Sequence, residues 1–258
     1  MSDYTPHEMM IIAAAREMAG RGVVFMGMNH PILAGCLAKL HHDPDLIFCT
    51  EPGFIDWEPP AGLARAPDAV SDPIQYNASA FCGDMTETLA AGLMGGRLYN
   101  LAVLPTGQID RYGNGNTLIS GDYNHPNQRI GGMGGNPDGA CLSPAVMFVV
   151  PHQQRRFKER VDFIASPGYL DGPGGRDRAG LDAQGPNVVV TTLGILRYDT
   201  ADGGFTGSCQ AYLDAVHPGV SVEEVRANTG WDLLLAPEVK TLAPPTEQEL
   251  ALLRRLVG

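Results

Sequence analysis

The segment Pro44-Asp-Leu-Ile-Phe-Cys-Thr-Glu-Pro-Gly53 decides how the rest of the chain is interpreted. Its apolar run from Leu46 to Thr50 predicts a short buried strand, which is followed by Glu51 and a Pro-Gly turn. Open α/β sheets bind their ligands outside the carboxyl ends of the strands. Glu51 is therefore the first candidate for a functional carboxylate. The alternative is a surface carboxylate or a partner for a helix N-terminus, because most isolated carboxylates are structural.

The residues before this segment complete a unit of strand, helix and strand. Thr5-Pro-His-Glu8 has the pattern of a capping box with proline at the first helical position, and it predicts a helix to about Ala19. Residues 23–27 predict a strand, and residues 31–40 predict the next helix. A helix that connects two strands in this order implies that the strands are parallel.

The remaining pattern extends this unit. Residues 98–104 and 145–150 predict further strands, whereas residues 54–79 have no clear period and predict a loop. Residues 187–198 and 205–213 carry β-branched or alternating side chains, and we expect them to pair as antiparallel strands. The predicted fold is therefore α/β: an open, mostly parallel, doubly wound sheet with helices on both faces and an antiparallel C-terminal addition.

Composition is typical of a globular protein and excludes some function classes. The chain has 258 residues, of which 44% are hydrophobic and 18% charged. No internal repeat or linker divides it, so we expect residues 1–258 to form a single domain. The net charge of −11 argues against a nucleic-acid surface and against binding to an anionic membrane.

Three sequence features bear on localisation. No apolar run approaches the roughly 20 residues of a membrane span. The first residues lack the basic and apolar regions of a signal peptide. The five cysteines show no CxxC spacing, and most lie in apolar runs, which is typical of buried thiols in a reducing compartment. We therefore expect a cytoplasmic protein.

A glycine-rich segment is the second candidate for a site. Gly131-Gly-Met-Gly-Gly135 is followed by Asn-Pro-Asp-Gly139. Glycines let a backbone approach a ligand closely, and successive N–H groups can bind an oxyanion or a phosphate. The segment is not a dinucleotide fingerprint, because Pro137 stands where glycine is required, and it is not a Walker loop, because no Lys-Ser or Lys-Thr follows. The alternative is a plain turn-rich loop.

Other reactive residue types give weaker signals. Cys49 shares a strand face with Glu51 by the period of two, so it is either a core thiol or part of the site lining. The seven histidines show no HxxxH or HxH spacing, and the chain has no GxSxG motif. We predict no metal site and no serine-hydrolase chemistry.

Four stretches together resemble the β subunit of the family I coenzyme A transferases, and within that family the glutaconate CoA-transferase branch. One is the strand end at Glu51; the others are Gly107-Gln-Ile-Asp-Arg-Tyr-Gly-Asn-Gly-Asn116, Gly131-Gly-Met-Gly-Gly-Asn-Pro-Asp-Gly139 and His152-Gln-Gln-Arg-Arg-Phe-Lys-Glu-Arg-Val-Asp-Phe-Ile-Ala-Ser-Pro-Gly-Tyr169. The resemblance runs from about residue 5 to residue 219. Its last two stretches are quite specific, whereas the glycine-rich loop alone is not.

The resemblance implies a Rossmann-like fold and an α subunit as partner, in a heterodimer or heterotetramer with the active site between the subunits. In this family the β-subunit glutamate attacks an acyl-CoA thioester, and Glu51 stands at that place. The implied substrates are a coenzyme A thioester and a carboxylic acid, with no permanently bound cofactor. The attack gives a glutamyl anhydride and then a glutamyl-CoA thioester.

The resemblance also assigns roles to the glycine-rich segment. Gly134 and Gly135 are the implied N–H donors to the tetrahedral oxyanions. The implied oxyanion- and CoA-binding loop as a whole consists of Gly132, Met133, Gly134, Gly135 and Asn136. Cys49 and Gln108 are further candidates for lining the site.

One departure from the family pattern concerns Pro52. Family members usually carry Asn, Ser or Gly directly after the glutamate, and proline removes a backbone N–H and stiffens the turn. Some relatives without the glutamate hydrolyse a carbon–carbon bond in CoA-linked steroid ring fragments, and others are decarboxylases. Three interpretations follow, in order of preference: a CoA-transferase subunit, a hydrolase of a CoA-linked ring or thioester with Glu51 as base, and a non-catalytic ligand-binding protein of the same fold.

Overall fold

The strand–helix–strand unit at the N-terminus forms as the sequence predicts. In the computed structural model, which describes residues 4–59, 65–67, 69, 71–95, 98–181, 183–200 and 205–258, it consists of α1 (Pro6–Met18), β1 (Val23–Met26), α2 (His30–Leu37), η1 (Ala38–His42) and β2 (Ile47–Thr50). The capping box also forms, because the side chains of Thr5 and Glu8 each accept a hydrogen bond from the other's backbone N–H. Strands β1 and β2 pair in parallel, as expected for a right-handed crossover.

A ten-stranded sheet runs through the described part of the chain in the order β14-β13-β12-β11-β10-β5-β1-β2-β3-β4. Its five central strands, β11, β10, β5, β1 and β2, are parallel. The bounds of the strands beyond the N-terminal unit are β3 (Phe54–Trp57), β4 (Ser79–Cys82), β5 (Leu101–Pro105), β10 (Val146–Val150), β11 (Pro186–Thr191), β12 (Gly194–Tyr198), β13 (Ala211–Val216) and β14 (Leu234–Thr241). The open, mostly parallel sheet of the prediction is confirmed.

The C-terminal end of the sheet is partly antiparallel, as expected. Strand β12 pairs antiparallel with both β11 and β13, and β14 then adds in parallel to β13. The predicted strand over residues 187–198 is in fact two strands, because a turn at residues 192–193 divides it into β11 and β12. The predicted partner over residues 205–213 is shifted toward the C-terminus, since β13 begins at Ala211.

The prediction of a loop over residues 54–79 is wrong at both of its ends. β3 and β4 extend the sheet as antiparallel strands beyond β2, and η2 (Pro73–Ala78) precedes β4. Each strand has only four residues, which is too short for a period to be recognised, and Asp56 within β3 has a φ of +50°. Pairing of β3 with β2, and of β4 with β3, therefore determines these strands more than their own sequence does. Residues 60–64, 68 and 70 of the predicted loop lie outside the described residues.

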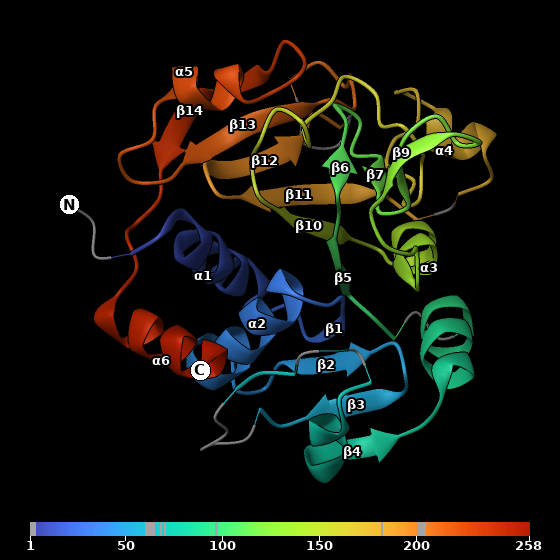
Figure 1. Cartoon of the computed structure of the whole chain (residues 1–258), viewed down its shortest axis with the longest axis vertical. Helices are drawn as coiled ribbons and strands as arrows, with labels where there is room; N and C mark the ends of the chain where they lie inside the picture. Colours follow the sequence, from blue (N-terminus) through green and yellow to red (C-terminus); the bar gives the residue numbers. More distant parts are fainter. Residues whose placement is uncertain are drawn as a thin grey trace.

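Helices cover both faces of the sheet (Figure 1). α1, α2 and α6 (Glu247–Val257) lie on one face, and η3 (Thr86–Gly95) and α3 (Asn136–Leu142) lie on the other. The remaining elements are the short helices α4 (Gly175–Arg178) and α5 (Val222–Ala227), and the small strands β6 (Gln108–Ile109), β7 (Gly115–Asn116), β8 (Ile119–Gly121) and β9 (Pro126–Arg129). No helix in the described ranges is long and apolar enough to cross a membrane.

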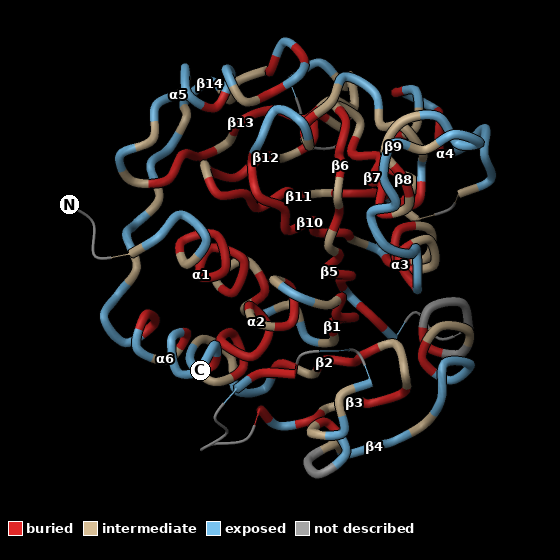
Figure 2. Tube along the Cα trace, in the orientation of Figure 1, coloured by how far each residue is buried: buried red, intermediate tan, exposed pale blue. Residues whose placement is uncertain are grey.

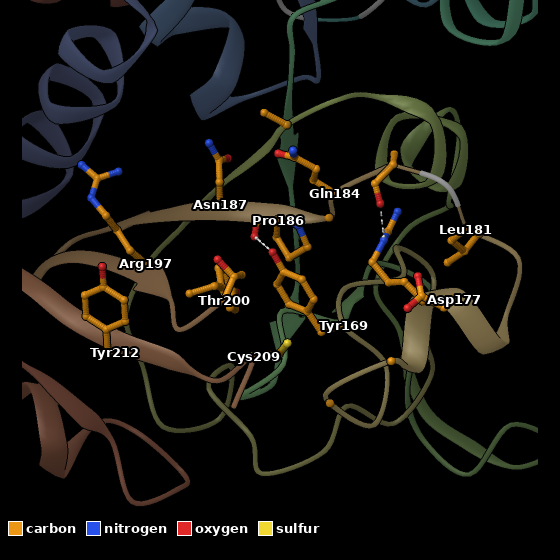
Figure 3. A pocket seen from close by; sticks show the side chains of 17 residues that line it. Tyr169, Asp177, Leu181, Gln184, Pro186, Asn187, Arg197, Thr200, Cys209 and Tyr212 are labelled. Carbon is orange, nitrogen blue, oxygen red and sulfur yellow. Dashed lines mark hydrogen bonds between the residues drawn. The ribbon is translucent and has the colours of Figure 1, made fainter. Parts of the chain in front are cut away.

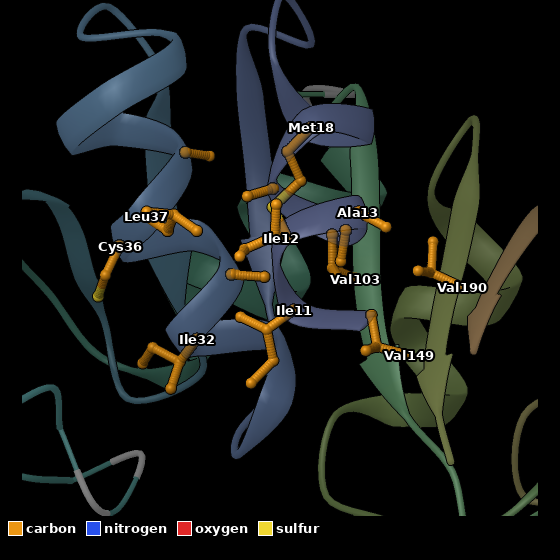
Figure 4. Packing of buried hydrophobic residues seen from close by; sticks show 14 of the residues in the cluster. Ile11, Ile12, Ala13, Met18, Ile32, Cys36, Leu37, Val103, Val149 and Val190 are labelled. Carbon is orange, nitrogen blue, oxygen red and sulfur yellow. The ribbon is translucent and has the colours of Figure 1, made fainter. Parts of the chain in front are cut away.

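Alternation along the strands builds two apolar layers. Val24 and Met26 of β1 face α1 and α2, whereas Phe25 faces the opposite side with Cys49 and Leu104. Figure 4 shows the first layer, in which side chains of α1 and α2 lie against those of the central strands. Each fully buried aliphatic side chain contributes about 1.5–3 kcal/mol, so this layer is the main stabilising feature of the sheet. Figure 2 shows the same pattern as a buried centre, with exposed residues in β9 at the periphery.

The C-terminal helix belongs to this core. Leu250, Leu253 and Leu256 of α6 are buried against the layer that α1 and α2 form. Thr246-Glu-Gln-Glu249 has the capping-box pattern in the sequence, and the box forms, since Thr246 and Glu249 exchange hydrogen bonds at the helix start. α6 therefore packs against α1 and α2 as part of the same core.

Candidate active site

Glu51 lies in the turn of a tight β-hairpin. Thr50 of β2 pairs with Phe54 of β3, so residues 51–53 form the turn, and the Gly53 N–H donates to the Thr50 carbonyl oxygen at 3.0 Å. This hydrogen bond does not involve residue 52, so the turn tolerates Pro52, which has no backbone N–H. Gly53 has a φ of +111°, and a Cβ on it would lie 2.4 Å from the carbonyl carbon of Gly83. Only glycine fits there, which explains the Pro-Gly pair after the glutamate.

A neighbouring helix fixes the backbone of this turn. The hydroxyl of Thr88, in η3, donates to the backbone carbonyl oxygen of Glu51 at 2.8 Å. Thr88 is fully buried, so its hydrogen bond is protected from water. The position of the Glu51 backbone is therefore set by both the sheet and η3.

The glycine-rich segment meets the carboxylate of Glu51 directly. The backbone N–H of Gly135 donates to Glu51 Oε2 at 3.0 Å, although the two residues are 84 positions apart in the sequence. A Cβ on Gly134 would lie 3.1 Å from the same oxygen, so the backbone of this segment is as close as glycine permits. Hydrogen bonds from a backbone N–H to a carboxylate are roughly twice as strong as neutral ones.

Local turn chemistry gives the segment this shape. Gly134 has a φ of +49°, and the Asn136 N–H closes a turn onto the carbonyl oxygen of Met133 at 3.0 Å. Gly135 is the N-cap residue of α3, and Pro137 lies in the first turn of this helix. Proline is tolerated there because N–H groups in the first turn have no partner within the helix. The alternative interpretation of this segment is a plain turn-rich loop. The structure shows a turn followed by the start of a helix, and the Gly135 N–H points toward Glu51.

A cavity of about 240 Å³ opens in front of Glu51. It lies at the carboxyl ends of three neighbouring parallel strands, β1, β2 and β5, which is where open α/β sheets bind ligands. The described residues that line it are Phe25, Met26, Gly27, Met28, Glu51, Pro105, Thr117, Gly132, Met133, Gly134 and Asn136. The lining is thus mostly apolar, with few polar side chains.

Polar side chains in this lining differ in what they already bind. The Asn136 amide donates to the Pro105 carbonyl oxygen at 3.1 Å and so fixes the loop to the end of β5. Thr117 is only 8% exposed, and its hydroxyl has no hydrogen-bond partner among the described residues. Sequence reasoning did not identify Thr117, because the signal is the absence of a partner in three dimensions.

The structure places Cys49 in the core rather than in the cavity lining. Its side chain is fully buried in the apolar layer that contains Phe25 and Tyr99. Burial raises the pKa of the Cys49 thiol to about 12, and this exceeds the smaller lowering effect of a hydrogen bond with Tyr99. The thiol therefore stays protonated at neutral pH and is a poor nucleophile.

Gln108 also lies away from the cavity lining, in a polar network behind it. Its amide donates to Asp162 Oδ2 at 2.8 Å, and its Oε1 accepts from the Asn116 amide at 2.7 Å and from the Asp162 N–H at 3.1 Å. Gln108 thus connects two of the segments that carry the sequence resemblance. Its structural effect is to fix Asn116, the neighbour of Thr117.

A larger cavity of about 580 Å³ lies on another part of the molecule, between α4 and the ends of β11 and β12 (Figure 3). Two arginines line it, but both are already committed: Arg176 donates to four backbone carbonyl oxygens, and Arg197 pairs with Glu17 and Asp214. None of the residues predicted as a site from the sequence lines this cavity. Within the described ranges, no group of three or more His, Cys, Asp or Glu residues could hold a metal ion.

Comparisons with known proteins cover most of the chain. The family model described as coenzyme A transferase matches residues 7–228. The chain is 35% identical over 256 residues to the B subunit of 3-oxoadipate CoA-transferase from Pseudomonas knackmussii, covering 99% of this chain and 94% of the relative. It is 33% identical over 248 residues to the B subunit of glutaconate CoA-transferase from Acidaminococcus fermentans, covering 94% and 89%.

Two further comparisons concern the fold and a more distant relative. The crystal structure of glutaconate coenzyme A-transferase from Acidaminococcus fermentans superposes with a TM-score of 0.86 and 32% sequence identity, covering 99% of this chain and 95% of that one. A cholesterol ring-cleaving hydrolase IpdB subunit of Rhodococcus jostii is 25% identical over 266 residues, covering 100% of this chain and 94% of the relative.

Proposed function

The chain belongs to the coenzyme A transferase family, and we propose that its Glu51 is the nucleophile that carries coenzyme A between two carboxylic acids. The similar proteins are named as B subunits, so the chain acts as one subunit of a CoA-transferase that requires a second, different subunit. Its substrate is a coenzyme A thioester. The observation that carries the proposal is the hydrogen bond from the Gly135 N–H to Glu51 at the mouth of a cavity.

The first half of the reaction moves coenzyme A onto the protein. Glu51 Oε1 attacks the carbonyl carbon of the acyl-CoA, the C–S bond breaks, and coenzyme A leaves as a thiolate, which gives a mixed anhydride between Glu51 and the acyl group. The thiolate then attacks Glu51 Cδ, and the acyl group leaves as a carboxylate with the bridging oxygen. The product is a glutamyl-CoA thioester and a free acid.

The second half runs the same steps in reverse with another acid. The acceptor carboxylate attacks Glu51 Cδ and expels the thiolate, forming a new mixed anhydride. The thiolate attacks the acyl carbonyl carbon of this anhydride, and Glu51 leaves as a carboxylate. Each step exchanges one leaving group for another, so no proton donor, oxidant or nucleotide is required.

The glycine-rich segment suits the steps at Glu51 Cδ. When the thiolate or the acceptor attacks this carbon, negative charge develops on Oε2, the oxygen that already accepts from the Gly135 N–H. A preorganised donor at a developing oxyanion typically accelerates a step by about 10²–10³-fold. We assign Gly135 this role, and Gly132, Met133, Gly134 and Asn136 the role of shaping the loop that meets coenzyme A.

Hydrolysis of a CoA-linked ring or thioester, with Glu51 as base, is the alternative function. The relative named as a cholesterol ring-cleaving hydrolase subunit motivates it, but at 25% identity that relative is more distant than the two transferase subunits. The hydrogen bond that closes the hairpin turn comes from the Gly53 N–H, so the turn does not need an N–H at position 52. Pro52 therefore gives no reason to favour hydrolysis. A non-catalytic role fits poorly with relatives that are named as enzyme subunits.

A trapping experiment on the complex with its partner subunit tests the nucleophile. The complex is incubated with glutaconyl-CoA, the adduct is treated with hydroxylamine, and the peptides are analysed by mass spectrometry. We expect a hydroxamate on Glu51 in the wild type, none in Glu51→Ala, and full labelling of Glu51 in Glu238→Gln, which changes an exposed glutamate on β14. Transfer that proceeds without any modification of Glu51 would show that the assignment is wrong.

Dependence on the acceptor separates the two functions. With donor and an acceptor acid such as acetate, a transferase forms a new acyl-CoA, and without the acceptor it stops after one turnover. A hydrolase releases product continuously in either case. Sustained turnover without an acceptor would favour the alternative.

A further inference from the structure

Three polar side chains lie in the described cavity lining, and among them only Thr117 has no hydrogen-bond partner, since Glu51 accepts from the Gly135 N–H. Thr117 is 8% exposed and lines the cavity in front of Glu51, yet its Oγ1 has no hydrogen-bond partner among the described residues. A buried hydroxyl without a partner is destabilising, and such groups are rare in folded proteins. The Asn136 amide, by contrast, is bound to Pro105. The Thr117 hydroxyl thus has no described intramolecular partner that would compete with a ligand in this cavity.

The backbone on both sides of Thr117 is firmly held. Asn116 is fully buried, donates its amide to Gln108 Oε1 and to the Ile119 carbonyl oxygen, and donates its N–H to Thr106 Oγ1. On the other side, the Leu118 N–H donates to Asn116 Oδ1 at 2.9 Å, and the Leu118 carbonyl oxygen accepts from the Ile130 N–H at 2.9 Å. A donor on such a backbone is preorganised, and preorganisation makes a hydrogen bond effective in a transition state.

The reaction needs donors at two different oxygens. The Gly135 N–H is committed to Glu51 Oε2, the oxygen that becomes negative when Glu51 Cδ is attacked. In the attack of Glu51 on the acyl-CoA, however, the negative charge develops on the carbonyl oxygen of the acyl group. A donor for this second oxygen has to come from a group that Glu51 does not already occupy.

We propose that the Thr117 hydroxyl donates a hydrogen bond to the carbonyl oxygen of the acyl group while Glu51 attacks it. The inference rests on the proposed function of Glu51 and divides the two oxyanions between two segments of the chain: the loop before α3 serves the glutamyl carbon, and the segment after β7 serves the acyl carbon. The substrate class that this donor recognises is an acyl thioester or the matching acyl anhydride. No bond to Thr117 forms or breaks.

Two substitutions at Thr117 test the proposal in the complex with the partner subunit. Thr117→Val keeps the shape and removes the hydroxyl, whereas Thr117→Ser keeps the hydroxyl and removes a methyl group. With glutaconyl-CoA as donor, we expect Thr117→Val to form the Glu51 adduct about 10²-fold more slowly in a single turnover, and Thr117→Ser to retain most of the wild-type rate. Ser143→Ala removes another buried hydroxyl without a described partner, outside the cavity, and is expected to leave the rate unchanged.

Two further readouts distinguish a donor from a structural residue. Hydroxylamine attacks the preformed adduct at Glu51 Cδ, so its cleavage rate is expected to be equal in Thr117→Val and in the wild type. The melting temperature of Thr117→Val is expected to equal or exceed that of the wild type, because a buried hydroxyl without a partner is removed. A purely structural role predicts a lower melting temperature and equal losses in Thr117→Val and Thr117→Ser, which would overturn the inference.

The same assays separate the role of Thr117 from that of Glu51. If the wild type forms the Glu51 adduct and Thr117→Val forms it at the same rate, the inference is wrong and the nucleophile assignment stands. If the wild type forms no adduct with a donor that it turns over, the nucleophile assignment fails, and the role of Thr117 fails with it.

Discussion

Two glutamates of this chain show how differently a protein can treat the same side chain. Glu249, at the start of α6, is nearly fully buried and binds Arg16 through both carboxylate oxygens, while Thr246 donates to it from its N–H and its hydroxyl. Glu51, in the hairpin turn, is half-buried and accepts from the Gly135 N–H beside a cavity. Glu249 has its hydrogen-bonding capacity filled, whereas Glu51 keeps an oxygen available.

This difference separates a structural carboxylate from a reactive one. A carboxylate held by a guanidinium and two N-cap donors is fixed in position and poorly nucleophilic, because its lone pairs are already engaged. A carboxylate held by one backbone N–H is oriented, yet it can still attack a carbon atom. The number of engaged lone pairs, rather than burial alone, is therefore the more informative quantity at these two sites.

The largest expected effect is on activity, in Glu51→Asp. This change keeps the charge but withdraws the carboxylate from the cavity by one methylene. We expect the transfer rate to fall by about 10²–10³-fold, equivalent to about 3–4 kcal/mol, because small misplacements of a reacting group are costly. Steady-state kinetics of the complex measure this loss, and a thermal melt within a degree or two of the wild type would show that the fold is unaffected.

The second effect is on stability, in Glu249→Gln. The substitution removes the charge that binds Arg16 and weakens the capping box of α6. We expect the free energy of unfolding to fall by about 2–3 kcal/mol, since Arg16 is left partly buried without its partner. Denaturant unfolding measures this change; an unchanged midpoint would contradict the view that Glu249 is structural.

The pH dependence of the same variant sharpens the contrast. Burial tends to raise the pKa of Glu249, but the hydrogen bonds from Arg16 and Thr246 outweigh it and lower the pKa from 4.5 to about 2. A carboxyl group whose pKa is lower in the folded state contributes stability above its unfolded pKa, and this contribution is lost as the pH falls from about 4.5 toward 2. The wild-type and Glu249→Gln unfolding curves are therefore expected to converge over this range; parallel curves would show that the pKa is not depressed.

The smallest effect is expected for Gly134→Ala. The new Cβ lies 3.1 Å from Glu51 Oε2 and also has to adopt a φ of +49°. We expect the transfer rate to fall by about tenfold and the free energy of unfolding by about 1 kcal/mol. Gly180→Ala is the matched control, because Gly180 has a φ of +70° with nothing within 4 Å of its added Cβ. Equal losses of activity in both variants would show that the carboxylate contact is unimportant.

Sequence reasoning predicted those parts of the fold that local patterns determine. Both capping boxes and the first parallel strand pair have clear local signals, and all of them form. Strands β3 and β4 gave no such signal, because β3 depends on pairing with β2, and β4, at the sheet edge, depends on pairing with β3. The split of residues 187–198 was missed because both halves are apolar and the turn between them is only two residues long.

For the site, the residue types were easier to predict than their contacts. Different signals point to Glu51 and Gly135, and the structure joins the two residues by a hydrogen bond across 84 positions. Their roles in catalysis stay predictions. Cys49 illustrates why strand periodicity alone is insufficient: it is buried in an apolar layer of the sheet, whereas Glu51 lies in the turn that follows β2. Thr117 could not have been found from the sequence, since nothing in its flanking residues tells which hydroxyl finds a partner.

The position of α6 has a practical consequence for anyone who trims this protein. The family match ends at residue 228, whereas the helix that covers α1 and α2 begins at Glu247. A gene cut at the alignment boundary would remove Leu250, Leu253 and Leu256 from the layer into which they pack, and would leave that apolar surface open to aggregation. The unit that the family model delimits is thus shorter than the unit that folds, and expression vectors should follow the second.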